Sequence, residues 1–108
     1  MARSRGSEDL VMFALEVDRR LLLLDAIRGR TAFRVSEVVG GTGRSLQNLS
    51  RAARELEAAG VLRATSPGKR TWKRYVVTAR GQRLLGLLAK RGWVRVPPAG
   101  RPPARKRP

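Results

Sequence analysis

The stretch from Ser36 to Leu85 constrains the fold of this 108-residue chain more than any other feature. In order, it predicts a short helix, a glycine-rich turn, an amphipathic helix, a basic hairpin and a last helix. On the amphipathic helix, apolar residues recur along one side, and polar side chains occupy the other. Such a helix has one side for a small core and another side free to contact a ligand.

The positive charge is concentrated in the second half of the chain. The formal net charge is +16, from 24 Lys and Arg against 8 Asp and Glu. All the acidic residues precede Gly60, whereas 14 of the basic residues follow it. A charge of this size and sign favours an anionic partner, either nucleic acid or an anionic membrane surface.

The composition argues against several functional classes. The chain has neither cysteine nor histidine, so it has no disulfide or thiolate metal site, and a serine nucleophile would lack its usual base. We therefore expect no catalytic residues, no metal and no cofactor. The aliphatic run Leu21 to Leu24 is far shorter than the roughly 20 residues that span a bilayer. We expect a cytoplasmic protein without a membrane partner.

The length indicates one domain with flexible ends. We expect a flexible basic N-terminus over residues 1–6, a folded domain over 7–92, and a disordered basic tail rich in proline and arginine over 93–108. The tail would add affinity for nucleic acid that is independent of sequence.

A single helix is predicted from an N-cap at Ser7 to Gly29. Its apolar residues cover more than one narrow stripe. Either one face packs on the domain and another on a partner, or the domain itself covers the whole helix.

The central segment is predicted in more detail. Residues 31–35 favour a strand, and Ser36 is expected to cap a short helix that ends at the glycines of 40–43. Ser45 is expected to cap the helix 45–59, with Gly60 as its left-handed C-cap. The predicted buried stripe of that helix is Leu46, Leu49, Ala53 and Leu56.

Residues 61–65 and 73–77 predict an antiparallel hairpin around Pro67 and Gly68, with Tyr75 and Val77 in the core. Thr78 is expected to cap a last helix that stops at Gly92.

Two segments resemble a known group of proteins. Residues 46–51 with 56–62, and residues 74–81 with their Thr-x-x-Gly start of a helix, are similar to transcription regulators of the MarR, ArsR and PadR type. The resemblance covers about Thr31 to Leu88, and the glycines at 40–43 depart from the usual pattern. It implies a mainly helical α+β fold: a winged helix-turn-helix with a three-helix core, a two- to three-stranded wing and an added C-terminal helix.

The outward side of the helix 45–59 carries the chemistry that reads base pairs. Asn and Gln can pair bidentately with adenine and Arg with guanine, while a helix N-terminus favours phosphate. The predicted contacts on this helix are Arg44, Ser45, Gln47, Asn48, Arg51 and Arg54, of which Arg44 and Arg54 are better suited to phosphates.

The wing is expected to contact the backbone or the minor groove. Its predicted contacts are Lys69, Arg70, Lys73 and Arg74, while Trp72 either covers the apolar side of the hairpin or stacks on sugar or base.

These features together predict a homodimeric, nucleoid-associated transcription regulator whose helix 45–59 enters the major groove of duplex DNA. The first helix and the leucines of residues 84–88 are candidate dimer surfaces. Two alternatives remain: an architectural DNA-binding protein with little site preference, and an RNA-binding winged helix.

Overall fold

The computed structural model describes residues 6–65 and 73–94. The expected hairpin tip, the tail from residue 95 and residues 1–5 lie outside this part of the chain. The described elements, in chain order, are α1 (Ser7–Glu16), α2 (Asp18–Ala26), β1 (Ala32–Phe33), α3 (Val35–Val38), the 3₁₀ helix η1 (Val39–Gly41), α4 (Leu46–Ala58), β2 (Leu62–Ala64), β3 (Tyr75–Val77) and α5 (Ala79–Lys90).

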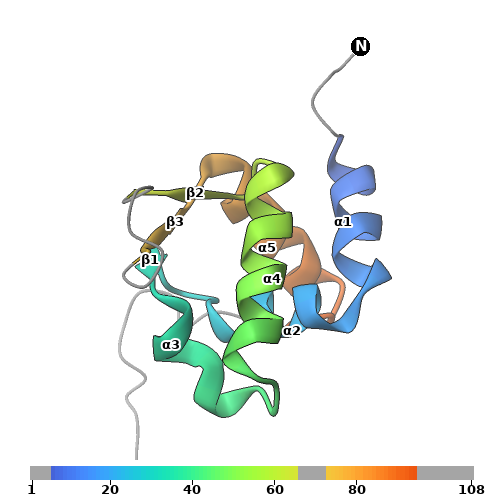
Figure 1. The fold of residues 1–108 in the computed structure, drawn as a ribbon. Helices are drawn as coiled ribbons and strands as arrows, with labels where there is room; N and C mark the ends of the chain where they lie inside the picture. Colours follow the sequence, from blue (N-terminus) through green and yellow to red (C-terminus); the bar gives the residue numbers. More distant parts are fainter. Residues whose placement is uncertain (1–5, 66–72, 95–108) are drawn as a thin grey trace, which may run out of the picture.

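Helix α4 lies between the small sheet and α1, with α3 before its N-terminal end (Figure 1). The three strands are antiparallel in the order β1-β3-β2. This arrangement is a winged helix-turn-helix, so the predicted α+β fold class is confirmed. In it, α3 and α4 form the helix-turn-helix, and β2 and β3 form the wing.

The core joins all the main helices to the inner side of the sheet. Phe33 of β1 faces Tyr75 of β3, and their rings stack with centroids 5.7 Å apart. Tyr75 is buried as predicted, whereas Val77 is only partly buried. The largest fully buried side chains are Phe33, Leu23, Leu24, Ile27, Leu49, Leu56, Leu62, Leu84, Leu88 and Val61.

The prediction of one N-terminal helix over residues 7–29 was wrong. The helix breaks at Val17, which is extended at φ −136° and ψ 126°, and α2 begins at the next residue. The break explains the broad distribution of apolar residues, because each short helix presents its own face to the core. Ser7 is also not the N-cap: Gly6 occupies that position, without a side-chain cap.

The short helix before the glycines begins and ends differently from the prediction. It starts at Val35 rather than after Ser36, and the Arg34 N–H donates to Glu37 Oε1 at 2.9 Å. The chain then continues through Gly40 and Gly41 as η1. Gly40 and Gly41 therefore continue the helix in the narrower 3₁₀ form instead of ending it. Among residues 40–43, only Gly43 takes a positive φ, +75°.

The ends of α4 and α5 agree with the sequence. Ser45 Oγ accepts a hydrogen bond from the Asn48 N–H at 3.0 Å, and Thr78 Oγ1 accepts one from the Gly81 N–H at 3.0 Å. Gly60 and Gly92 adopt φ of +84° and +82° after the two helices. Capping residues and C-terminal glycines thus fixed these boundaries.

Two predictions about apolar residues were wrong. Leu46 was expected in the buried stripe, but it is 49% exposed, and Ala52 joins the stripe instead. The leucines of residues 84–88 are a predicted dimer surface, but Leu84, Leu85 and Leu88 are buried within the domain and Leu87 is partly buried. In α5 the leucines complete the core of one copy of the chain.

Candidate nucleic-acid interface

Helix α4 presents a polar, positively charged side away from the core. Its inner side is made by Leu49, Ala52, Ala53 and Leu56, all fully buried. At 100° per residue, Gln47, Arg51 and Arg54 fall together on the opposite side, and all three are exposed. Within the described residues, neither Arg51 nor Arg54 is paired with a carboxylate. Both guanidinium groups are therefore available to an external anion or base.

The N-terminus of α4 lies at the surface, with Arg44 and Ser45 exposed. Arg44 extends toward α2, where its Nη2 lies 3.5 Å from Oδ2 of Asp18. This ion pair is well exposed and therefore weak, so a phosphate can compete for the guanidinium. Asn48 differs from its predicted neighbours: it is only partly exposed, and its buried Oδ1 accepts no hydrogen bond from any described residue.

A groove of about 870 Å³ runs beside this side of α4. It is bounded by α3, α4 and the start of the wing, and its described lining includes cationic, polar and apolar residues but no carboxylate. The lining residues are Arg34, Val35, Ser36, Leu46, Gln47, Ser50, Arg54, Lys73 and Tyr75. Three cations on one groove form a local anion-attracting surface.

Lys73 reaches this groove from the wing. Its Nζ lies 5.6 Å from the centroid of the Tyr75 ring, which is a cation-π arrangement. Arg74, the next residue, lies near enough to Glu37 to help lower the pKa of that carboxyl group, although the main cause is the hydrogen bond from the Arg34 N–H. The predicted contacts Lys69 and Arg70, and also Trp72, lie outside the described residues.

Sequence reasoning missed Arg34, Ser36, Leu46 and Ser50 as members of this surface. Ser50 and Leu46 lie one turn apart on one flank of α4 and were identifiable by helical spacing. Arg34, the N-cap residue of α3, lines the groove where α3 packs beside α4 and the start of the wing.

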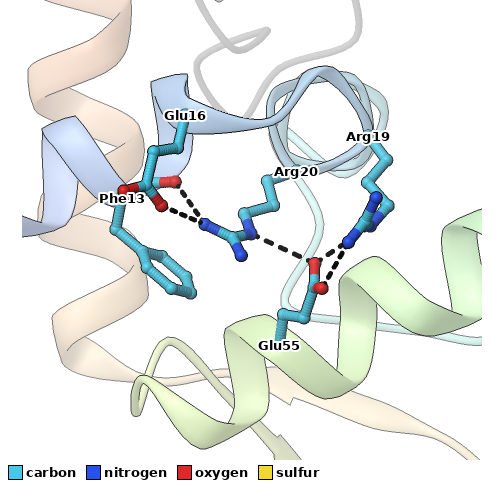
Figure 2. Close-up of polar contacts among 5 residues, drawn as sticks. All are labelled: Phe13, Glu16, Arg19, Arg20 and Glu55. Carbon is cyan, nitrogen blue, oxygen red and sulfur yellow. Dashed lines mark hydrogen bonds and ion pairs between the residues drawn. The ribbon is translucent and has the colours of Figure 1, made fainter.

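On the other flank of α4, an ion-pair network holds the helix against α2. Figure 2 shows Arg19 and Arg20 converging on Glu55 from the same helix. The Nε atoms of Arg19 and Arg20 lie 3.0 and 3.1 Å from Glu55 Oε1. Mainly through the hydrogen bond from Arg19, the network lowers the pKa of Glu55 from 4.5 to about 2. This contact fixes how α4 is mounted on the domain.

Most of the acidic residues in the described part of the chain are paired with arginines. Six of the eight form ion pairs with arginines in the described regions: Glu8, Glu16, Asp18, Asp25, Glu37 and Glu55. The negative charge is thus mostly neutralised locally, and the excess positive charge remains at α4, the wing and α5.

Residues 6–65 and 73–94 contain no group of three or more acidic residues arranged to hold a metal ion. Nor does any helix in these ranges have the length and apolar character to cross a membrane.

The fold has a counterpart among solved structures. The chain is similar to "TubR bound to 24 bp of tubC from Bacillus thuringiensis serovar israelensis pBtoxis", with a TM-score of 0.67 over 84% of this chain and 100% of that chain. The two sequences are 12% identical, so the likeness concerns the fold alone. No protein-family model matches the chain, and no curated protein matches it.

Proposed function

We propose that this protein is a transcription regulator that binds duplex DNA with α4 in the major groove. The observation that carries the proposal is the outward side of α4, where Gln47, Arg51 and Arg54 lie exposed beside a groove without carboxylates. The major groove admits an α-helix, and each base pair presents a distinct pattern of donors and acceptors there. Gln47 and Arg51 have the side chains to read that pattern.

Phosphate contacts would orient the helix. We expect Ser45 and Arg44 at the N-terminus of α4, and Arg54 farther along it, to contact the phosphate backbone of the DNA. We expect the same of Lys73 and Arg74 in the wing. Lys69 and Arg70, which are expected at the hairpin tip, belong to the same proposal. Asn48 belongs to it too, provided that DNA contact exposes its partly buried amide. The solved TubR complex supports the proposal, because a protein of the same fold binds DNA.

We propose further that the regulator is a homodimer of the MarR, ArsR and PadR type, with two α4 helices in successive major grooves. With Leu84, Leu85 and Leu88 of α5 buried, the remaining candidate for the dimer surface is the N-terminal pair of helices and the end of α5. Met12 and Trp93 are 64% and 51% exposed there. Sedimentation equilibrium of the wild type and of Met12→Lys and Trp93→Lys tests this proposal: one substitution that yields monomers supports it, and a wild-type monomer contradicts it.

The net charge of +16 favours a second candidate, an architectural protein that coats DNA with little site preference. RNA binding is the third. Selection from a random duplex library at raised salt separates the candidates, with structured RNA as a competitor. Enrichment of an inverted repeat supports the dimeric regulator. Binding of duplex DNA without enrichment of any sequence supports the architectural role. Preferential displacement of the duplex by structured RNA supports RNA binding.

A further inference from the structure

Leu46 is a large apolar side chain exposed at the surface of α4, the helix that we propose to read DNA. It is the first residue of α4, directly after the Ser45 cap, and it is 49% exposed. Large apolar residues exposed in the described parts of the chain are Met12, Leu46 and Trp93, and of these Leu46 alone lies on α4. The fold leaves this leucine at the surface although the helix has a fully buried stripe beside it.

The surroundings of Leu46 are those of a ligand contact rather than of a core. Helical geometry places it between the buried stripe and the outward side, on the same flank as Ser50 and Arg54. All three line the groove that Lys73 enters from the wing. Gln47, the adjacent residue, is exposed on the outward side. An apolar group therefore lies among cations and hydrogen-bonding groups at the N-terminal end of α4.

One group in the major groove of DNA matches this arrangement. The C5 methyl of thymine is the apolar feature that distinguishes its base pair there, and apolar side chains recognise it by contact. Gln47 pairs most favourably with adenine, the partner of thymine. We propose that Leu46 contacts a thymine methyl group and, with Gln47, makes α4 selective for A·T base pairs where these two residues contact the DNA.

This inference rests on the proposed function, since it needs α4 in the major groove. Its test uses the full-length protein and the duplex recovered by library selection. Each thymine of that duplex is replaced in turn by uracil, which removes only the C5 methyl, and the dissociation constant is measured for wild type, Leu46→Ala and Leu46→Met. Thermal unfolding of all three proteins checks that they fold, as the exposed position of Leu46 leads us to expect.

The expected result is a thymine in each half-site whose replacement weakens wild-type binding about fourfold, the ratio that about 0.8 kcal/mol for one buried methyl-sized group gives. Leu46→Ala should be insensitive to that replacement, and Leu46→Met, which keeps an apolar contact, should retain most of the sensitivity. If wild type and Leu46→Ala respond equally at every thymine, the inference fails while the proposed function stands. If the wild type binds no duplex, or binds without a preferred sequence, both fail.

Discussion

Arg20 Nε donates a hydrogen bond of 3.1 Å to Glu55 Oε1 and so joins α2 to the helix that we propose to read DNA. Nη1 of the same guanidinium donates to the Phe13 carbonyl and to Glu16 Oε1, each at 2.9 Å. The group also lies 3.8 Å from the centroid of the Phe13 ring. As Figure 2 shows, one side chain spans the break between α1 and α2 and reaches α4.

Replacing Arg20 with alanine should therefore destabilise the fold. The substitution removes the donor to the Phe13 carbonyl in the last turn of α1 and one of the two guanidinium groups at Glu55. We therefore expect the free energy of unfolding to fall by about 1.5 to 3 kcal/mol. Urea denaturation measures it. Arg83→Ala, at an exposed position on α5, is the matched control and should change stability little. Equal effects of the two substitutions would contradict the structural role of Arg20.

The lowered pKa of Glu55 predicts how stability depends on pH. Because the pKa in the folded state is about 2, below the ordinary 4.5, ionised Glu55 stabilises the fold fully above about pH 4.5. That contribution is lost as the pH falls toward 2. We expect the difference in unfolding free energy between wild type and Glu55→Gln to shrink over this range, measured against Glu57→Gln as a control for charge on the same helix. A difference that stays constant with pH would show that the ion pairs contribute nothing.

Gly81 should not tolerate a side chain. A Cβ atom at this position would lie 2.4 Å from the Val61 carbonyl oxygen and 2.8 Å from Val77 Cγ1, so the start of α5 would have to move away from the wing. Gly81→Ala should cost about 1 to 3 kcal/mol. Gly86, in the same helix, has open space around its Cβ position, and Gly86→Ala should stabilise by about 0.5 to 1 kcal/mol. Thermal unfolding of both variants distinguishes these effects, and a stabilising Gly81→Ala would contradict the packing.

Local signals predicted the parts of this fold that depend on local chemistry. The caps at Ser45 and Thr78 and the glycines at 60 and 92 ended helices where expected, because capping and left-handed backbone involve only neighbouring residues. The antiparallel pairing of β2 with β3 also followed from two β-rich runs on either side of Pro67 and Gly68 in the sequence.

Tertiary contacts decided what the sequence left open. Arg20 spans the break at Val17 by donating to the Phe13 carbonyl, and it also donates to Glu55, which lies 35 residues farther along the chain. A contact between residues so far apart has no local sequence pattern. Helical spacing placed Leu46 in the buried stripe, but Leu46 lies at the edge of that stripe. At the edge, the extent of the core around the helix determines whether a side chain is buried, and Leu46 is exposed. The groove forms where α3, α4 and the start of the wing meet in three dimensions, and this meeting brings in Arg34, which was not among the predicted contacts.

Substitution of Lys73 tests whether the wing contacts the phosphate backbone of DNA. Lys73→Ala should weaken binding to all duplexes by a similar factor and should lower the slope of log K against log salt by about 0.9, the contribution of one phosphate contact. Fluorescence anisotropy over a series of salt concentrations measures both quantities. An unchanged slope would remove Lys73 from the interface.

Arg51 is the residue whose substitution best shows whether α4 reads base pairs. The measurement is the ratio of the dissociation constants for a scrambled duplex and for the selected site, at one salt concentration, for wild type, Arg51→Ala and the control Arg83→Ala. A lost bidentate contact to guanine removes about 1 to 3 kcal/mol of discrimination, so the ratio for Arg51→Ala should fall about fivefold or more while the control keeps the wild-type ratio. Equal weakening of both duplexes by Arg51→Ala, with the ratio unchanged, would show that α4 does not read base pairs through Arg51.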